Sequence, residues 1–453
     1  MGIFGAMETA VSGMSAQAFA LDNISGNIAN SQTIGYKRID TNFQDMIPDL
    51  GLTSRITGGV NATSLATNSV AGAFKSTGIN SNIALSGDGY FATSQKTTSA
   101  SGASSFASTP YFTRRGDFTL DKNKNLVNGA GYYLMGYTVD PISGMANSGV
   151  PKTIQLPTGD MPPKATSTIT YQGNLPTTPS NPVDTANALP AGTAQNTTTI
   201  GGVTTSFPAT IGVYNANEES SFLNATIAGG SVTVYDSKGS PATLQTRWAK
   251  NSGGNWDLYY ESNSTASGTA PKWKYLQNFQ FDAGGKLTTP APPSFATTGL
   301  TIDGTALGSV SIDFTGMSQY GDPSGQFRTT NIAQDGYSSA SLTGVNFGDK
   351  GRVYAQYSNG LQQPVADIAV AKFNGGQALK RLDGGVYQQS DQSGDPIYGA
   401  GDSNILVGGL EASNADISQE FSLMIATQQA YSANAKVITA AQQMMTEAVN
   451  VIR

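Results

Sequence analysis

The sequence predicts a mostly β protein with an α-helix at each terminus. Three observations support this fold class: a long heptad pattern closes the chain, a matching pattern opens it, and the residues between them form short β-prone runs separated by turns. At 453 residues the chain is long enough for about two to four domains of roughly 150 residues each. We therefore expect several β domains between two terminal helices.

The C-terminal stretch, residues 411–453, organises the rest of the chain. From Ile417 onward, selected side chains recur at alternating intervals of four and three residues, which is the spacing of a coiled-coil seam. The d positions are Ile417, Met424, Tyr431, Ile438, Met445 and Ile452, and the a positions are Phe421, Gln428, Ala435, Gln442 and Val449. Asp416 and Gln419 have the spacing of a helix-capping box. The pattern predicts one helix of about 37 residues.

A second seam opens the chain. Its a positions are Met7, Met14, Leu21 and Ile28, and its d positions are Ile3, Ala10, Gln17 and Ile24. Gly13 and Gly26 each cost this helix about 1 kcal/mol relative to Ala, so it is marginal alone. Two interpretations stay open: the terminal helices pair as a coiled coil, or each packs on a globular core. Because both seams lie at chain ends and a long β-like middle separates them, we expect the coiled coil.

Composition excludes several classes of function. The net charge of -6 gives no electrostatic basis for binding nucleic acid. The chain has no Cys and no His, which rules out disulfides, thiolate nucleophiles, histidine triads and imidazole metal sites. The N-terminus lacks the features of a secretory signal peptide, and no apolar run is long enough to span a membrane. If the protein is exported, we expect a route without a cleavable signal peptide.

Two short motifs suggest chemistry, and both are better explained as structure. Asp121, Asn123 and Asn125 have the spacing of calcium ligands, but the positions that need Gly and Glu in such a loop hold Leu and Tyr. We expect a polar hairpin loop there. Glu218 and Glu219 have no neighbouring nucleophile or second activated group, so a solvated pair is expected rather than a catalytic one. The sequence thus predicts no catalytic residue, metal site or cofactor.

Both chain ends carry the signature of a known family. The N-terminal signature follows the run from Leu21 to Ile28 and comprises Ala29, Asn30, Thr33, Gly35, Tyr36 and Lys37. The C-terminal signature comprises Leu410, Glu411, Ser413, Asn414 and Asp416. These two signatures, in this order and at opposite ends, resemble those of bacterial flagellar rod and hook proteins. The β-prone segments 83–92 and 111–120 resemble the first β domain of the same family.

The resemblance implies a nested organisation. Its parts are coiled-coil helices in residues 1–30 and 411–453, an extended connector in 31–71, a discontinuous β-rich middle domain in 72–146 and 316–410, and an inserted outer sandwich or barrel in 147–315, as one domain or two. The runs 231–239 and 279–285 within the insert are similar to hook subunits, whereas rod subunits lack such an insert. Residues 174–205 carry no family motif.

The resemblance also implies a structural function. A hook subunit polymerises into a short flexible helical tube that transmits motor torque from rod to filament, outside the cell. The implied partners are further copies of the chain, the distal rod protein, the hook–filament junction protein, the hook cap and the flagellar export apparatus, with no nucleic acid and no membrane insertion. We expect the assembly seam to comprise Met7, Met14, Leu21, Ile24, Ile28, Ile417, Phe421, Met424, Tyr431, Ile438, Met445, Val449 and Ile452.

Two alternatives stay open. A distal rod or hook–filament junction protein would share the terminal signatures, although the long insert argues against the rod protein and the near-complete match argues against the junction protein. An exported β-rich polysaccharide hydrolase with paired carboxylates belongs to a different class. Such an enzyme would turn over substrate as a monomer, whereas a hook subunit should polymerise.

Overall fold

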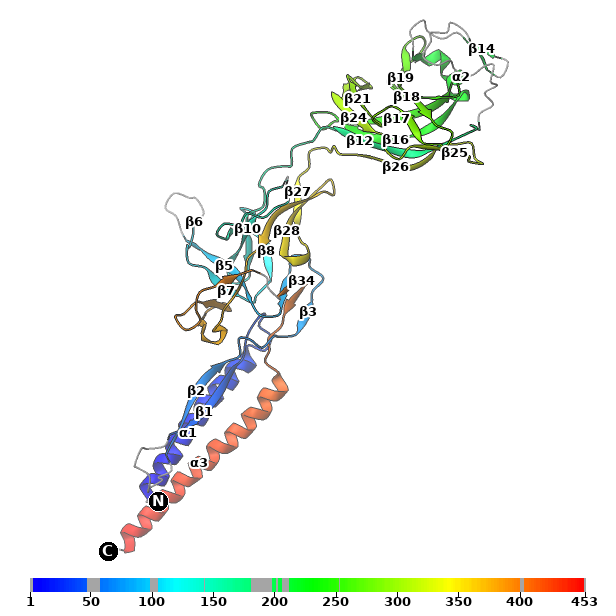
Figure 1. The fold of residues 1–453 in the computed structure, drawn as a ribbon. Coiled ribbons are helices and arrows are strands. Elements are labelled where there is room, and N and C mark those ends of the chain that lie inside the picture. The colour runs from blue at the N-terminus through cyan, green and yellow to red at the C-terminus, as the bar shows by residue number, and fades with distance from the viewer. Residues whose placement is uncertain are drawn as a thin grey trace. The chain divides into compact units, whose positions relative to one another are not determined.

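The chain folds into two compact units, one inserted into the other. The computed structural model describes residues 3–46, 58–97, 105–141, 143–180, 198–200, 203–205, 212–251, 253–399 and 403–451. Unit 1 comprises residues 1–158 and 342–453, and unit 2 comprises residues 159–341. Strands dominate both units and the long helices lie at the two chain ends, which confirms the predicted fold class (Figure 1).

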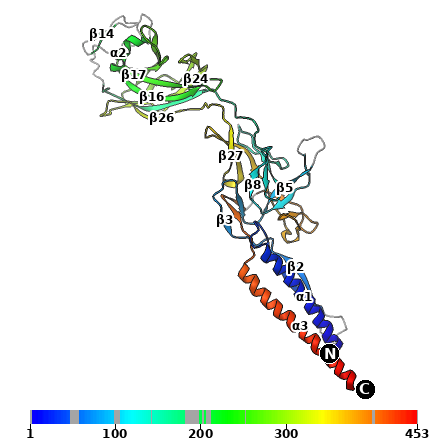
Figure 2. The ribbon, with the colours of Figure 1, turned by 180° about the vertical axis from the view of Figure 1, so that it is seen from behind.

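Unit 1 begins and ends with the two long helices. Helix α1 (Ile3–Ala29) and helix α3 (Ile417–Val451) lie side by side and run antiparallel, as two opposite views show (Figures 1 and 2). The predicted cap is present, because Asp416 Oδ1 accepts hydrogen bonds from the backbone N–H groups of Ser418 and Gln419, at 2.8 and 3.0 Å. The start of α1 and the end of α3 lie together at one end of this helical pair.

A β-hairpin accompanies α1 where the sequence predicted only an extended connector. Strand β1 (Ile39–Asp45) pairs antiparallel with strand β2 (Val60–Ala66) over seven residue pairs without a bulge. Two contacts tie the hairpin to α1: Val60 N–H donates to Ser12 Oγ at 3.2 Å, and Asn23 Nδ2 donates to Thr41 Oγ1 at 2.9 Å. Residues 47–57 of the expected connector lie outside the described residues.

The β part of unit 1 interleaves strands from both sides of the insert. Its strands are β3 (Phe74–Ser76), β4 (Ile83–Ser86), β5 (Tyr90–Thr97), β6 (Ser105–Phe106), β7 (Tyr111–Thr113), β8 (Phe118–Leu120), β9 (Leu126–Asn128), β10 (Tyr132–Thr138), β11 (Lys152–Thr153), β27 (Leu342–Phe347), β28 (Arg352–Tyr357), β29 (Gln362–Ile368), β30 (Val370–Lys372), β31 (Lys380–Leu382), β32 (Val386–Gln388), β33 (Ile397–Tyr398), β34 (Asn404–Val407) and β35 (Gly409–Glu411), with short 3₁₀ turns η2 (Asp349–Gly351) and η3 (Gly376–Ala378). The main sheet runs β27-β28-β29-β10-β5-β7-β32-β31, and β4 pairs with β34 and β3 with β35. Neither segment can form this sheet without the other.

The segments of unit 1 before and after the insert both contribute side chains to its core. Tyr90 and Phe112 come from the segment before the insert, and Phe373 and Tyr387 come from the segment after it. The rings of Tyr90 and Tyr387 lie 5.3 Å apart, and those of Phe112 and Phe373 meet edge to face at 4.7 Å. Burial therefore couples the two segments as strongly as the strand pairing does.

Within its described residues, unit 2 contains two large sheets that share one main core, and two small two-stranded sheets. Its elements are β12 (Thr168–Pro176), β13 (Thr198–Ile200), β14 (Val203–Thr205), β15 (Val213–Asn215), η1 (Ala216–Glu218), α2 (Glu219–Asn224), β16 (Thr226–Tyr235), β17 (Pro241–Lys250), β18 (Trp256–Glu261), β19 (Pro271–Phe281), β20 (Leu287–Thr289), β21 (Ser294–Thr298), β22 (Thr301–Ile302), β23 (Thr305–Ala306), β24 (Ser309–Asp313), β25 (Ser318–Tyr320) and β26 (Arg328–Gln334). One large sheet runs β21-β24-β12-β25, with β26 also on β12, the other runs β15-β19-β18-β17-β16, and the small sheets are β13-β14 and β22-β23. Tyr171 from the first sheet packs against Trp248 from the second, with ring centroids 5.9 Å apart.

The insert has different boundaries from those that the sequence predicted. Residues 316–341, assigned to the middle domain, belong to unit 2 because β26 pairs with β12 from Ile169–Gln334 to Asn174–Arg328. Residues 147–158 belong to unit 1 because β11 pairs with β10. Turn and strand signals in a sequence do not specify which strand a run will pair with, which is why both ends of the insert were misplaced.

Two chain segments side by side form the base of unit 2, and we call them the neck (residues 159–167 and 335–341). Bridges join Met161 to Ala340 and Lys164 to Tyr337. Asp335 holds the two segments of the neck together, and we call its contacts the Asp335 clamp. Its carboxylate accepts hydrogen bonds from Ser167 and from the backbone N–H of Thr168, and it forms an ion pair with Lys164 Nζ at 2.9 Å. Burial alone would raise the pKa of Asp335, but these hydrogen bonds outweigh it and hold the pKa far below its usual range.

Candidate assembly surface

The two terminal helices approach each other closely because small residues line their contact. The buried positions of α1 are Ala10, Gly13, Ala16, Ala20, Ile24 and Asn27. A Cβ atom on Gly13 would lie only 2.9 Å from the side-chain amide nitrogen of Asn434, so a larger residue there would displace the Asn434 side chain. On α3, Glu420, Thr427 and Ala441 are buried. These positions recur at intervals of seven residues, so the helical pair has a coiled-coil seam.

One row of the observed seam on α3 lies one residue earlier in the sequence than the predicted row. Met424, Ile438 and Met445 are partly buried, whereas the fully buried positions of α3 are 420, 427 and 441, each one residue before the predicted 421, 428 and 442. Phe421 and Val449 are 49% and 60% exposed. Met7, Met14, Leu21 and Ile28 flank the contact and are half-buried, and Ile417 and Tyr431 are exposed, whereas Ile452 lies outside the described residues. Small or polar residues form the closest contact between the two helices, and a search for regularly spaced apolar residues does not find them.

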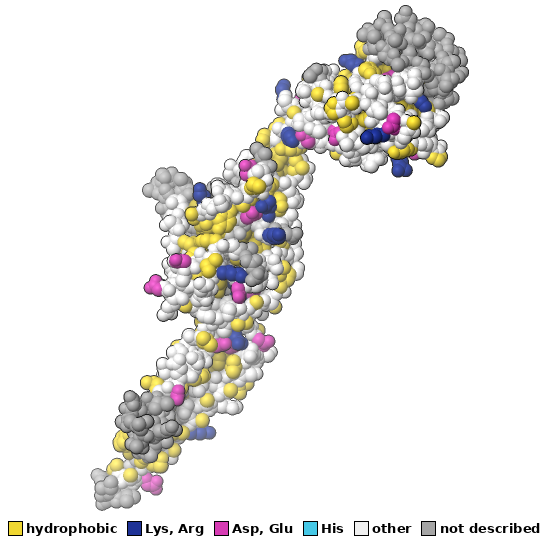
Figure 3. All heavy atoms as spheres, in the orientation of Figure 1, with side chains coloured by type: hydrophobic (Ala, Val, Ile, Leu, Met, Phe, Trp, Pro, Cys, Tyr) yellow, Lys and Arg dark blue, Asp and Glu magenta, His cyan; other side chains and the backbone are white. Residues whose placement is uncertain are grey.

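Much apolar surface on the helical pair is left exposed by the other residues that the structure describes. Its large exposed apolar side chains are Phe4, Val11 and Phe19 on α1 and Ile417, Phe421, Leu423, Ile425, Tyr431, Val437, Met444 and Val449 on α3. The space-filling view shows apolar side chains along the visible face of the pair and few charged ones (Figure 3). An apolar surface of this extent marks an interaction site, so we take the outer faces of the two helices as the candidate assembly surface.

Asn27 joins three elements at the base of the helical pair. Its Nδ2 donates to the carbonyl of Ile39 at 3.0 Å and to Glu420 Oε2 at 3.3 Å, and its Oδ1 accepts from Ile39 N–H at 2.9 Å and from the Tyr36 hydroxyl at 3.3 Å. Glu420 Oε1 has no hydrogen-bond partner among the described residues, although the whole residue is only 1% exposed. The resemblance to the family includes both residues, but the sequence does not predict that they contact each other.

We expect Glu420→Gln to strengthen the pairing of the two helices at neutral pH. Burial raises the pKa of Glu420, and the hydrogen bond from Asn27 and the charge of Arg38 only partly oppose this. Because the pKa of Glu420 is raised in the folded protein, ionisation of Glu420 opposes the pairing of the two helices. The pairing is therefore at full strength below the ordinary carboxyl pKa of about 4.3 and weakens as the pH rises through the raised pKa. The critical concentration for assembly of the wild-type protein should therefore increase as the pH rises above the ordinary carboxyl range, and the variant should lose most of that increase.

Glu447→Gln is the matched control, since Glu447 is an exposed carboxylate on the same helix. It removes the same charge without relieving a buried one. If both variants change the pH dependence equally, then general charge repulsion and not the burial of Glu420 is responsible.

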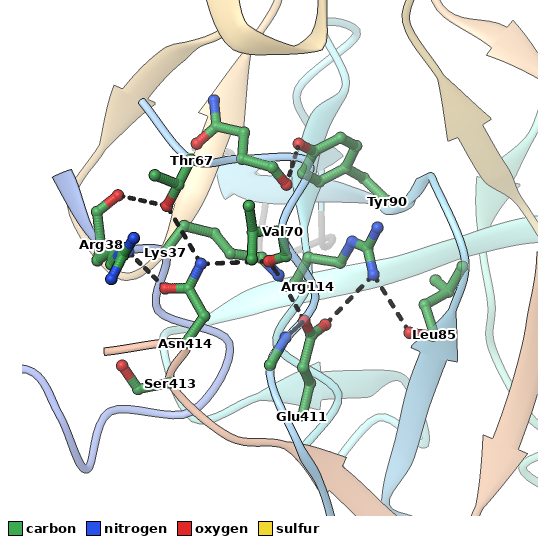
Figure 4. A network of polar contacts seen from close by, with 12 residues as sticks. Lys37, Arg38, Thr67, Val70, Leu85, Tyr90, Arg114, Glu411, Ser413 and Asn414 are labelled. Atoms are coloured by element: carbon green, nitrogen blue, oxygen red, sulfur yellow. Dashed lines mark hydrogen bonds and ion pairs between the residues drawn. The ribbon is translucent and has the colours of Figure 1, made fainter. Parts of the chain in front are cut away.

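Beneath the helices, a buried ionic cluster joins them to the β-sheet (Figure 4). Glu411 of β35 binds Lys37 Nζ at 2.5 Å, Arg114 Nη1 at 3.3 Å and the backbone N–H of Gly72 at 2.8 Å. All three charged side chains are at most 3% exposed. Lys37 also donates to the carbonyl of Val70 at 2.6 Å. Burial lowers the pKa of Lys37, and Glu411 opposes that shift. We call this cluster the joint.

The family-signature residues gather around the joint. Asn414 accepts from the backbone of Arg38 at 2.7 Å and donates to Thr67 Oγ1 at 3.1 Å (Figure 4). Gly35 has φ +67° and donates its N–H to the carbonyl of Glu411 at 2.8 Å. The remaining signature residues play local roles: Ala29 ends α1, Asn30 accepts from Thr33, Tyr36 lies under Arg381, Leu410 pairs with Lys75, Ser413 accepts from Ala415, and Asp416 caps α3.

Sequence analysis missed Arg114, which supplies the second cation of the joint. Its guanidinium donates to the carbonyls of Leu85 and Gly87 and lies 5.3 Å from the centre of the Tyr90 ring. The only sequence signal is two consecutive arginines after a strand. A single sequence does not show which of Arg114 and Arg115 points inward.

The motifs that suggested chemistry have structural roles. Asp121 Oδ1 accepts hydrogen bonds from the backbone N–H groups of Asn123 and Asn125, so its carboxylate stabilises its own turn. Glu218 accepts from the backbone of Asn215, whereas Glu219 pairs with Lys272 at 2.8 Å. Across the described residues, no three metal-ligating side chains gather into a metal site. No described helix is both long enough and apolar enough to cross a membrane.

Paired terminal helices on a discontinuous β domain with an insert define a flagellar axial protein, as four family models show. They match residues 7–37 (flagella basal body rod protein), 84–177 (flagellar hook protein FlgE/F/G D1 domain), 224–337 (flagellar basal body protein FlaE D2 domain) and 407–451 (flagellar basal body rod FlgEFG protein C-terminal).

The chain belongs to the flagellar hook protein family. It is 31% identical to the flagellar hook protein FlgE of Rhizobium meliloti (strain 1021), covering 100% of both chains, and 30% identical to FlgE of Escherichia coli (strain K12), covering 98% of this chain and 99% of the relative. A crystal structure of the Helicobacter pylori flagellar hook protein FlgE2 matches 74% of this chain and 100% of that one, with a TM-score of 0.46 and 16% identity. The predicted family is therefore confirmed.

Proposed function

We propose that the chain is the structural subunit of a bacterial flagellar hook, which polymerises into a short flexible tube and transmits torque from rod to filament. The observation that carries this proposal is the uncovered apolar surface on both terminal helices of a member of the hook family. A surface that cannot be covered within one subunit requires neighbouring copies. The family is structural, which confirms the expectation that the chain is not an enzyme.

Within this proposal, the residues of the predicted seam divide into two groups. The partly or fully buried residues hold α1 and α3 together, and they are Met7, Met14, Leu21, Ile24, Ile28, Met424, Ile438 and Met445. The exposed residues are available to other subunits, and they are Ile417, Phe421, Tyr431 and Val449. The proposal assigns the first group to the subunit fold and the second to assembly.

The remaining partners follow from the same proposal. A hook subunit would meet the distal rod protein at one end of the tube and the hook–filament junction protein at the other, with the hook cap and the export apparatus as transient partners. It would act outside the cell, after export.

Electron microscopy of the purified protein at increasing concentration tests the proposal. Above a critical concentration we expect tubes that bend, because the subunit carries its own assembly surface. A straight tube would favour the distal rod alternative, and short capped rings would favour the junction protein. A protein that stays monomeric at every concentration and hydrolyses a polysaccharide would overturn the structural function.

We also propose that unit 2 is dispensable for assembly. Replacing residues 159–341 by a short linker should leave unit 1 folded, because the neck ends lie side by side at the Met161–Ala340 bridge and because the core of unit 1 draws no residue from the insert. The shortened protein should still form tubes, with altered bending in electron micrographs. A soluble, folded excision variant that forms no polymer would contradict the nested organisation.

A further inference from the structure

Helix α3 carries a second apolar row beside the one that contacts α1. Leu423, Ala430, Val437 and Met444 recur every seven residues and therefore lie along one line of the helix. Leu423 and Val437 are each 45% exposed, Met444 is 51% exposed and Ala430 is partly buried, so the three larger side chains of this α3 row are left largely uncovered by the described residues.

Helix α1 carries a matching row on its outer side. Phe4, Val11 and Ala18 also recur every seven residues, and all three are exposed, Phe4 by 73% and Val11 by 51%. This α1 row lies outside the buried positions of the helix.

The side chains of both rows become smaller in the same direction along the helical pair. Gly13 lies opposite Asn434, and Asn27 contacts Glu420, which sets the levels at which the antiparallel helices correspond. At these levels, to within one residue, Phe4 corresponds to Met444, Val11 to Val437 and Ala18 to Ala430. Large, medium and small side chains thus occur at the same heights in both rows, so both rows taper in the same direction.

We propose that the α3 row of one copy packs against the α1 row of a second copy at the same level, with Val437 beside Val11 and Met444 beside Phe4. This contact rests on the proposed hook function and names the two surfaces that meet. Charge favours the same pairing, because Glu8 lies one turn from Val11 and Lys436 adjoins Val437. Glu8 and Asp22 are the only charged residues of α1, so that helix presents only negative charge to Lys436.

The two rows are different surfaces of one subunit, and this has a consequence for assembly. A copy that uses its α3 row on one neighbour still offers its α1 row to another. Such head-to-tail contacts generate rings or open helices, whereas a surface that binds itself generates a closed dimer. The proposed contact therefore accounts for a polymer by geometry alone.

Cysteine cross-linking tests the pairing, because the natural chain contains no Cys. Full-length Val11→Cys and Val437→Cys variants are prepared separately, mixed in equal amounts, polymerised and oxidised. We expect disulfide-linked dimers from the mixture and almost none from either variant alone, since a disulfide needs Cβ atoms within about 3.5–4.5 Å. Dimers from Val437→Cys alone would show that α3 rows meet each other, and no dimer from a polymerised mixture would place the contact elsewhere. Both results would overturn the inference.

Charge variants give a second readout that does not depend on disulfide geometry. Val11→Lys and Val437→Glu should each raise the critical concentration for assembly at least 30-fold alone, whereas an equal mixture should return it to within a few fold of wild type, because each oppositely charged pair then meets across a contact. Far-UV circular dichroism of the monomers checks that both variants fold. Failure of the wild-type protein to polymerise would count against the proposed function, whereas mixtures that fail beside a polymerising wild type would count against this pairing only.

Discussion

Replacing Glu411 by Gln is expected to lower the free energy of unfolding of unit 1 by about 3–5 kcal/mol. Glu411 is the only carboxylate in contact with both Lys37 and Arg114 among the described residues, and all three side chains are buried. The Gln variant keeps the shape of the side chain but leaves two buried cations without a counter-charge. Lys37 should then lose its proton more easily, because Glu411 is what opposes the effect of burial on its pKa.

The distribution of tryptophan separates the two units in this measurement. All three Trp residues of the chain, Trp248, Trp256 and Trp273, lie in unit 2. Urea unfolding followed by Trp fluorescence should thus be unchanged, while the transition seen by circular dichroism for unit 1 should move to lower urea concentration. Asp367→Asn is the matched control, because it breaks a partly exposed pair with Arg352 and should cost about 1 kcal/mol or less. Equal losses in the two variants would mean that the joint is no stronger than a surface ion pair.

Ile438→Asp is expected to abolish assembly without weakening the β core. Ile438 is partly buried on α3 and belongs to the predicted seam, so a carboxylate there would lose part of its hydration or displace its neighbours. A cost of roughly 2–4 kcal/mol would raise the critical concentration by about 30- to 1000-fold, beyond the range of ordinary preparations. Sedimentation of polymer measures this, and the melting temperature of the β core reports on the rest of the subunit.

Ser432→Asp provides the control for this second prediction. It places the same charge on the same helix, at an exposed position outside the seam. If Ser432→Asp prevents assembly equally well, then negative charge on α3 and not loss of the seam is responsible. If Ile438→Asp lowers the melting temperature of the β core, then the helices stabilise unit 1 more directly than the structure indicates.

The parts of the fold that could be predicted are those that depend on local patterns. An uninterrupted heptad and a capping Asp416 specify a helix whatever surrounds it, and the structure places that cap where the sequence predicted it. The position of the seam could not be predicted, because it depends on how closely two helices approach. Gly13 and Thr427 allow that approach, and neither contributes to an apolar pattern.

The joint shows a different limit of sequence reasoning. Resemblance identified Lys37, Glu411 and Asn414 as marked positions, but nothing in the sequence brings residues 37, 114 and 411 together. Their contacts span more than 290 positions along the chain and exist only once both halves of unit 1 have paired. Strand pairing likewise decided the ends of the insert, since the partner of β26 is β12 and not a strand of the middle domain.

The neck of unit 2 has a mechanical consequence. A domain held by one peptide strand can spin about the single bonds of that strand, so it cannot pass a twist onward. Unit 2 is held by two strands that continue into β12 and β26, and these two are hydrogen-bonded neighbours in one sheet. Turning the insert about its attachment would wrap the two strands around each other and strain the Asp335 clamp. The two paired strands of the neck therefore resist twisting of unit 2 at its base, which a single strand in that place would not do.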